Sequence, residues 1–134
     1  MKRNSKLSLA LHTLGHMADD QERMLTSAEI ATHVGTNPVV VRRVLGRLRE
    51  AGLLISEKGH AGGWRLARSP EGITLADVYI ALDESIIASG SPGESPSCSV
   101  ESALHSRVAG ILQQTEMALI EQLGKTTIAD VHDD

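Results

Sequence analysis

The sequence predicts a mainly α-helical fold with one small β-hairpin. Three observations support this prediction: apolar residues recur at helical spacing in several segments, capping residues and glycines separate short helices, and one glycine-rich stretch lies between two short apolar runs. The length of 134 residues suits one domain with an appendage. Because 41% of the residues are hydrophobic but Phe is absent and Trp and Tyr occur once each, the core is expected to be aliphatic.

Three helices are predicted in the first half of the chain. Apolar residues three and four positions apart over residues 7–18 predict an amphipathic first helix. The sequence TSAE at 26–29 is a capping box that starts a short helix, and Gly35 ends it. Asn37 is a good N-cap and the following proline suits a first helical position, so the next helix is predicted over 38–51. Two short helices joined by a tight glycine turn indicate a helix-turn-helix.

A β-hairpin is predicted directly after this motif. Residues 53–56 and 64–67 are two short strand candidates around a glycine-rich tip at 57–63. A helix-turn-helix followed by a β-hairpin is a winged helix. The sequence TLAD at 74–77 resembles a second capping box, with Asp in place of Glu, and predicts a helix that extends to about Ala88.

The remainder of the chain is predicted to contain a loop and a long helix. Residues 89–99 are rich in turn-forming types, and an apolar stripe then follows a helix of about 24 residues, about 36 Å long. So small a domain cannot cover such a helix alone, so the stripe is expected to meet a partner chain. The expected dimer-interface residues are Val100, Leu104, Val108, Ile111, Leu112, Leu119 and Leu123. A further short turn is expected near 126–131.

These elements suggest three parts of the chain. We expect a winged-helix domain over 1–88, a sensor or linker loop over 89–99, and a dimerisation helix with a C-terminal tail over 100–134. No run of 18 or more apolar residues occurs, which argues against a membrane span. The basic N-terminus is followed by helically spaced apolar residues rather than by a signal peptide, so a cytoplasmic location is expected.

Charge is distributed unevenly along the chain. The net charge is −4, which by itself argues weakly against nucleic acid as a partner. Residues 37–68, however, carry seven basic and two acidic side chains, a net charge of +5, whereas residues 69–134 carry two basic and eleven acidic side chains, a net charge of −9. Because the local field decides where a polyanion docks, the basic segment favours double-stranded DNA as a partner.

The helix predicted over 38–51 is the expected reading element. Its apolar stripe should pack inward, while exposed arginines can reach guanine edges or phosphates and exposed valines can touch thymine methyls. The hairpin tip offers a second contact, and its glycines let the backbone approach the duplex closely. The expected DNA-contacting residues are Asn37, Val39, Val40, Arg42, Arg43, Arg47, Lys58, Gly59, His60, Gly62 and Gly63.

Other roles are open for some of the neighbouring residues. Arg47 and Arg49 lie further along, toward the hairpin, where an ion pair with Glu50 or with the acidic part of the chain is the alternative to DNA contact. Trp64 is expected to pack within the hairpin rather than to wedge between bases.

A family resemblance emerges from these segments. The stretches SAEIA, VRRVLGRLREAGLLISEKGHAGGWRLAR and ITLADVYIALDE, and the closing TIADV, resemble the IscR/NsrR/CymR-type winged-helix transcriptional regulators of bacteria, the Rrf-two family. The resemblance covers nearly the whole chain and is strongest in L-x-x-L-R-x-A-G-L-L and K-G-x-x-G-G-W-x-L-A.

The resemblance implies a homodimeric transcriptional regulator that binds a palindromic operator, and we expect a repressor. The helix over 38–51 would enter the major groove, the hairpin over 57–63 would be the wing in the adjacent minor groove, and the long helix would cross its twofold mate. Val39, Arg42 and Arg43 would face bases. The two half-sites would then lie about 34–36 Å apart.

The sensor of such a regulator is not evident in the sequence. Many members of the family hold an iron–sulfur cluster on three cysteines in the loop before the long helix, whereas this chain has Cys98 alone, so no such cluster is expected. Cys98 is a sensor candidate as a redox-active thiol, which a helix N-terminus would favour. The alternatives are a plain buried residue, an intersubunit disulfide or a metal ligand. The loop could instead line a pocket for a small-molecule effector.

No other chemistry is predicted. His12 and His16 lie four residues apart on the first helix, but no third ligand is near them in sequence, so an exposed polar face is expected and no metal site. No nucleophile elbow or phosphate-binding glycine loop occurs, so no enzyme is expected. Two alternatives to a simple DNA-binding regulator remain: a protein-interaction module with an acidic tail, and a Cys98 thiol-based redox-sensing regulator.

Overall fold

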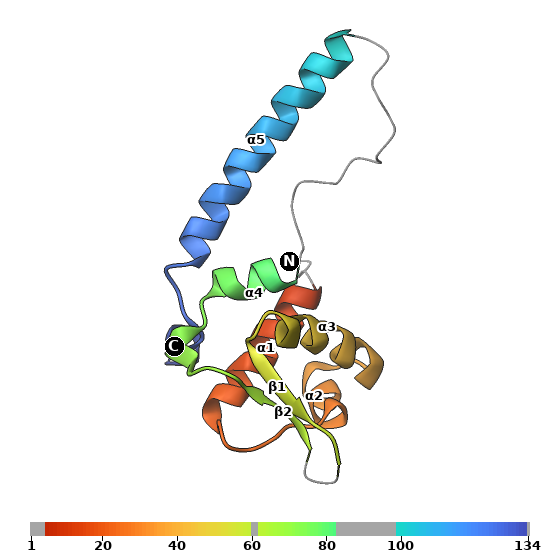
Figure 1. Ribbon diagram of the computed structural model, residues 1–134, viewed down its shortest axis with the longest axis vertical. Helices are drawn as coiled ribbons and strands as arrows, with labels where there is room; N and C mark the ends of the chain where they lie inside the picture. Colours follow the sequence, from red (N-terminus) through yellow and green to blue (C-terminus); the bar gives the residue numbers. More distant parts are fainter. Residues whose placement is uncertain (1–4, 60–61, 83–98, 134) are drawn as a thin grey trace.

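The fold is mainly helical with one two-stranded antiparallel sheet, as the sequence predicts. The computed structural model describes residues 5–59, 62–82 and 99–133. Figure 1 shows a body of helices and one hairpin, from which the long helix α5 projects. The elements in chain order are α1 (Ser5–Asp19), α2 (Ser27–Val34), α3 (Pro38–Glu50), β1 (Leu54–Glu57), β2 (Gly63–Leu66), the 3₁₀ turn η1 (Pro70–Gly72), α4 (Leu75–Ala81), α5 (Ser99–Leu123) and α6 (Ile128–Asp133).

Local capping determines where α2 and α3 begin and end. The Thr26 hydroxyl accepts a hydrogen bond from the backbone N–H of Glu29 (3.1 Å) and donates to the Glu29 carboxylate (3.2 Å). Gly35 adopts the left-handed conformation with φ 73°, which ends α2. The Asn37 side chain then accepts from the backbone N–H of Val40 (3.1 Å), which starts α3 two residues after the glycine. The predicted helix-turn-helix is therefore confirmed.

Each strand of the hairpin is displaced by one residue from its predicted bounds. Leu54 pairs with Leu66 at the base, so the first strand begins at Leu54 and not at Leu53. The reason is that the backbone N–H of Leu53 donates to the carbonyl of Leu48 (2.9 Å), which keeps Leu53 in the turn that closes α3.

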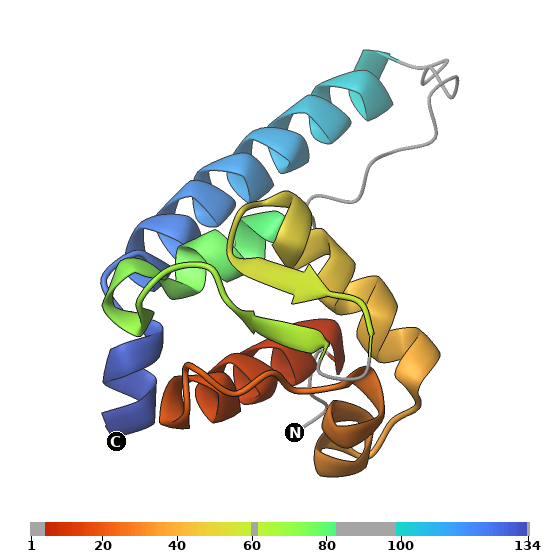
Figure 2. The same cartoon turned by 60° about the horizontal axis from the view of Figure 1, so that its bottom comes forward.

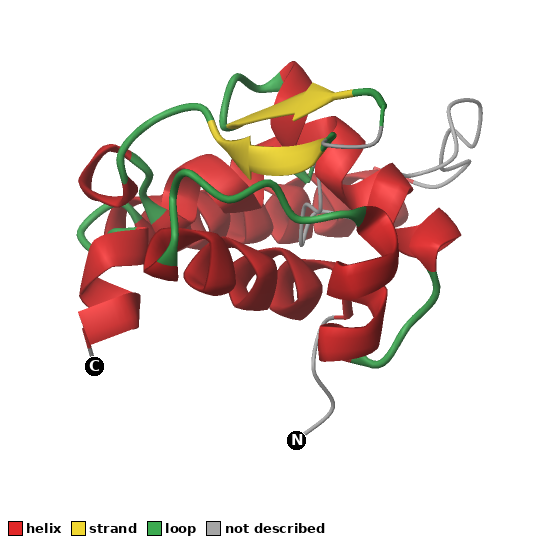
Figure 3. Ribbon diagram, turned by 90° about the horizontal axis from the view of Figure 1, so that it is seen from below, coloured by secondary structure: helices red, strands yellow, loops and turns green. Residues whose placement is uncertain are grey.

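A third segment pairs with the hairpin. The backbone N–H of Leu25 donates to the carbonyl of Trp64 (3.0 Å), and the N–H of Trp64 donates to the carbonyl of Leu25 (2.8 Å). This pair of bonds ties the chain before α2 to β2. The strands lie on the outside of the helical body (Figure 3).

The core is formed by apolar faces of α1, α2, α3, α4 and the hairpin, together with Ile73 and with Ile128 of α6. Its side chains are almost all aliphatic, as expected, and Trp64 is the one aromatic ring within the core cluster of the described residues. The largest side chains with almost no exposure are Leu14, Met17, Ile30, Val41, Val44, Leu45, Leu48, Leu53, Leu54, Ile73, Val78 and Ile128.

The long helix α5 is held to the body near its C-terminal end. After α5 the chain returns to the body, where the backbone N–H of Leu75 donates to the carbonyl of Thr126 and that of Ile128 donates to the carbonyl of Ile73 (both 2.9 Å). The turn expected near 126–131 is the helix α6, which packs beside α1 (Figure 2). None of the 25 residues of α5 is buried.

Two expectations fall partly or wholly outside the described residues. The helix that begins with the Thr74 capping box is α4, and its predicted extension over 83–88 lies outside the described part of the chain. The same holds for most of the predicted loop over 89–99. Among the described helices, none combines the length and apolar composition that a membrane crossing needs.

Candidate nucleic-acid interface

One face of α3 is buried in the core. Val41, Val44, Leu45 and Leu48 are each at most 2% exposed. Their spacing of three and four residues places them on a single stripe of the helix. The rotation of α3 about its axis is therefore fixed by packing.

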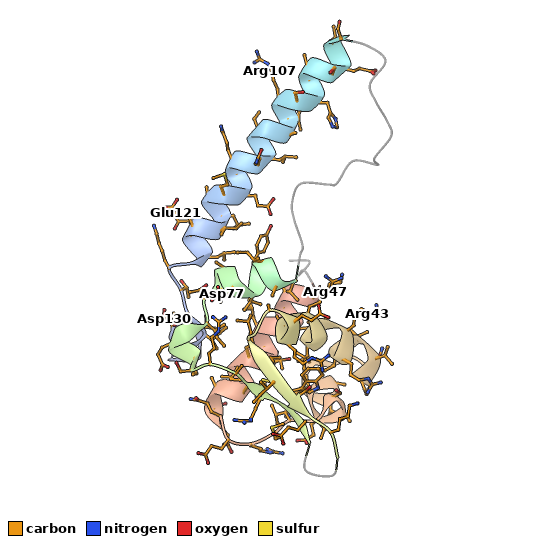
Figure 4. The ribbon with its side chains drawn as sticks, viewed as in Figure 1. Arg43, Arg47, Asp77, Arg107, Glu121 and Asp130 are labelled. Atoms are coloured by element: carbon orange, nitrogen blue, oxygen red, sulfur yellow. The ribbon has the colours of Figure 1, made fainter. Side chains whose placement is uncertain are left out.

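The opposite face of α3 presents arginines to solvent. Arg42, Arg43 and Arg47 are exposed. In the part of the chain that the structure describes, no salt bridge or side-chain hydrogen bond engages any of these three side chains. Figure 4 shows Arg43 and Arg47 extending from α3 away from the body. Three cations thus remain available to a ligand that carries negative charge.

The amino-terminal end of α3 differs in part from the expectation. Val39 is 56% exposed beside the arginines, as a base-facing residue requires. Val40 is half-buried and packs against the core, so its side chain is less accessible than expected. The side-chain oxygen of Asn37 accepts from the Val40 N–H, which leaves the NH₂ group of Asn37 for any further contact.

The carboxyl-terminal end of α3 contacts the hairpin. A guanidinium nitrogen of Arg49 donates to the hydroxyl of Ser56 on β1 (2.9 Å), and the guanidinium carbon lies 5.5 Å from the centroid of the Trp64 ring on β2. Within the described residues, Arg49 forms no ion pair with Glu50, which was the alternative considered from the sequence. Trp64 is 7% exposed and packs in the core, which confirms its predicted packing role.

A groove separates the helix-turn-helix from the hairpin. It is an open hollow of about 480 Å³ that is lined from α2, α3 and both strands. Arg42, Arg49 and Lys58 supply positive charge to its lining, and Glu57 is the acidic residue among its lining residues. Lys58 and Gly59 are exposed at the hairpin tip, whereas His60 lies outside the described residues.

The hairpin glycines have a folding role that the sequence did not reveal. A Cβ atom on Gly63, whose φ is +145°, would lie 2.6 Å from the carbonyl oxygen of Leu25. A Cβ atom on Gly62 would collide with the carbonyl oxygen of Glu57. Gly59 has φ +105° and accepts a hydrogen bond from the Gly62 N–H (3.0 Å) at the hairpin tip. These glycines are required to close the hairpin, and close approach to DNA remains a prediction.

The histidines form a cluster away from this groove. The Nε2 atoms of His12 and His16 lie 2.9 Å apart, and the ring of His33 on α2 stacks on that of His16 at a centroid distance of 4.9 Å. The three rings are exposed, as expected for the first two. The sequence did not identify His33 as a neighbour because it lies on a different helix. A larger hollow of about 570 Å³ lies beside His12 and His33, between α1 and the turn that joins α2 to α3.

The fold and this basic face define a winged helix-turn-helix protein. The chain matches the model of the Rrf2 family, described as iron-dependent transcriptional regulators, over residues 3–134. It therefore belongs to the Rrf2 family and is a transcriptional regulator of the helix-turn-helix type, not an enzyme.

Similar sequences and solved structures agree with this assignment. YwnA of Bacillus subtilis (strain 168), described as an HTH-type transcriptional regulator, is 33% identical over 132 residues that cover 96% of this chain and 95% of YwnA. A solved structure described as a DNA-binding protein is 29% identical with a TM-score of 0.74, and the match covers 94% of this chain and 97% of that one. IscR of T. potens is 25% identical with a TM-score of 0.67, over 100% of this chain and 88% of IscR.

The family's description raises the question of an iron site. The described residues contain no cysteine, since Cys98 lies outside them. Nor do they contain a group of three or more His, Cys, Asp or Glu side chains that could hold a metal ion. The residues that the structure describes therefore do not fit an iron ion or an iron–sulfur cluster.

The clash at Gly63 leads to a stability prediction. Gly63→Ala should destabilise the fold by about 1–3 kcal/mol from its backbone conformation alone, with a further cost from the contact with Leu25. The matched control is Gly46→Ala within α3, where an added Cβ meets nothing within 4 Å and should stabilise by about 0.5–1 kcal/mol. Urea unfolding followed by circular dichroism measures both. An unchanged midpoint for Gly63→Ala would contradict the assigned role.

Proposed function

We propose that this chain is a homodimeric repressor of transcription that recognises a palindromic operator. In this proposal α3 enters the major groove, and the hairpin enters the adjacent minor groove as the wing. The main support for this proposal is that Arg42, Arg43 and Arg47 are exposed on a helix whose opposite face is buried. A dimer that occupies an operator excludes other proteins from it, which is why repression is the expected outcome.

The dimensions and charge of α3 suit the major groove. Its 13 residues give a length of about 20 Å, and the groove, about 12 Å wide, admits one α-helix. The guanidinium groups can donate to guanine edges or to phosphates, and exposed Val39 can contact a thymine methyl. In this arrangement Lys58 on the hairpin would contact a second stretch of the DNA backbone. Phosphate contacts would supply affinity, and contacts with base edges would supply sequence preference.

The apolar stripe of α5 supports the homodimer. Val100, Leu104, Val108 and Ile111 recur every three or four residues along α5, and each is more than half exposed in the single chain. Leu112, Leu119 and Leu123 are half-buried along the same helix. A continuous exposed apolar surface of this kind is typical of a protein interface. A second copy of α5 would cover it and hold two copies of α3 about 34–36 Å apart.

The proposal includes no iron–sulfur cluster and leaves the effector open. With one cysteine per chain, a dimer supplies two thiols, too few for a cluster that needs three from each subunit. A redox role for Cys98 rests on the sequence alone. As a regulator of transcription, the protein would act in the cytoplasm, where it has access to the chromosome.

A salt titration tests the DNA-binding proposal. Because binding releases counterions from the duplex, the affinity for a random duplex should fall steeply between about 50 and 200 mM salt. Binding that is absent at low salt, or that does not respond to salt, contradicts the proposal.

Arg43 gives the first mutational prediction. Arg43→Ala should weaken binding to a selected operator by about 1–3 kcal/mol if Arg43 reads a base, and should reduce the salt slope by about 1 if it contacts a phosphate. The operator is first selected with the wild-type protein from a random pool, and binding is measured by fluorescence anisotropy. Arg107→Ala on α5 is the matched control and should bind like the wild type. Equal effects of the two substitutions would count against the assignment of α3 as the reading helix.

The proposed dimer gives the second mutational prediction. Ile111→Glu places a charge on the apolar stripe of α5 and should shift the protein from dimer to monomer in sedimentation velocity. Gln113→Glu adds the same charge at an exposed position of α5 outside the named stripe, and should leave the dimer intact. A monomeric wild-type protein, or an Ile111→Glu variant that sediments as a dimer, would overturn the proposed interface.

A further inference from the structure

Arg49 differs from the other arginines of α3 because its guanidinium group is engaged within the fold. It donates to the Ser56 hydroxyl (2.9 Å) and lies over the ring of Trp64, 5.5 Å from its centroid. Arg47, two residues earlier on α3, has no comparable partner within the described residues. The same residue type thus serves two purposes on one helix.

The ring that Arg49 contacts is itself anchored to α2. The indole N–H of Trp64 donates to the Ser27 hydroxyl at the start of α2 (3.0 Å). The backbone of Trp64 exchanges two hydrogen bonds with Leu25, just before α2. Trp64 is therefore held from the α2 side, and Arg49 approaches it from α3.

Together these contacts connect both helices of the helix-turn-helix to both strands of the hairpin. Ser56 lies two residues before Lys58, so a bond to Ser56 holds the strand that leads to the hairpin tip. Arg42, Arg49 and Lys58 all line the groove between α3 and the hairpin. The contacts of Arg49 therefore lie in the same groove as Arg42 on α3 and Lys58 at the hairpin tip.

We propose that Arg49 is a positioning residue, which fixes the wing relative to α3 through Ser56 and the ring of Trp64, and that it does not itself contact DNA. Arginine suits this role because its planar guanidinium can stack on an aromatic face while it donates in a fixed direction. Holding the wing in place before DNA arrives lowers the ordering cost of specific binding. This inference rests on the proposed DNA-binding function.

Four variants test the proposal. Arg49→Lys keeps the positive charge but loses the planar stacking group, and Ser56→Ala removes the acceptor without any change of charge. Ser56→Thr keeps the hydroxyl and serves as the conservative rescue. Arg107→Lys on α5 is the control of the same substitution type, because Arg107 lies outside the groove and outside the proposed DNA-contacting residues. Each is measured by fluorescence anisotropy on the operator selected with the wild-type protein and on a random duplex of equal length.

The expected result is a loss of specificity with little loss of general affinity. Arg49→Lys and Ser56→Ala should each weaken operator binding by about three- to tenfold, because Arg49→Lys loses the planar stacking group and Ser56→Ala loses the hydrogen bond. Affinity for the random duplex should stay within about twofold, since the charge that attracts phosphates is unchanged. Ser56→Thr should bind like the wild type.

A second measurement does not depend on DNA. Trp64 is the single tryptophan of the chain, so its fluorescence reports the contact with Arg49 directly. Arg49→Lys should change the emission intensity of the free protein, and Arg107→Lys should not.

Three outcomes on the selected operator would overturn the inference. Wild-type affinity of both Arg49→Lys and Ser56→Ala would show that the contact does not matter for binding. Weak binding of Arg49→Lys with wild-type binding of Ser56→Ala would mean that Arg49 contacts the DNA itself. An equal loss on operator and random duplex would indicate a general phosphate contact. If the wild-type protein binds no DNA, the proposed function fails, while the fluorescence result still tests the contact.

Discussion

The burial of one stripe of α3 is the constraint on which the rest of the structure depends. Val41, Val44, Leu45 and Leu48 lose nearly all contact with water, and burial of each such side chain stabilises the fold by about 1.5–3 kcal/mol. Any rotation of α3 that brought an arginine inward would expose part of this stripe and bury a charge. The helical repeat therefore directs Arg42, Arg43 and Arg47 to solvent as a consequence of core packing. The exposed basic face of α3 is therefore a consequence of the packing of its opposite, apolar face.

Electrostatics determines both the free-energy cost of exposing several arginines on one helix and the kind of ligand that this surface suits. Like charges on adjacent turns of α3 repel one another, because salt screens such repulsion fully only beyond a Debye length of about 8–10 Å. A salt bridge joins Arg23 to Glu29 at the start of α2, away from these arginines. The acidic residues are concentrated in the second half of the chain. A duplex would relieve the repulsion, which is why the local charge and not the net charge of −4 indicates the ligand.

The elements that follow from local signals were predictable from the sequence. Thr26, Gly35, Asn37 and Thr74 each act within three or four residues of their own position, and the structure places a helix end at each of them. The apolar spacing in residues 99–123 likewise predicted α5 almost to the residue.

Features that depend on long-range contacts were not predictable. The partners of Arg49 lie seven and fifteen positions away, on different strands, and the Trp64 bond to Ser27 spans 37 positions. The glycines were expected to serve DNA approach, but their tight contacts with Leu25 and Glu57 appear only when the hairpin is folded. The strand bounds shifted because Leu53 completes the turn of α3. The roles of His60 and Cys98 stay predictions, because both lie outside the described residues.

Site-specific photo-crosslinking tests the central claim most directly. A benzoylphenylalanine is placed in turn at Val39 on α3 and at Val131 on α6, both of which are exposed in the folded chain. Irradiation with labelled operator DNA should crosslink the probe at Val39 and leave the probe at Val131 free of DNA. Crosslinking from Val131 with none from Val39 would contradict the account, because the DNA would then lie against a different face of the molecule.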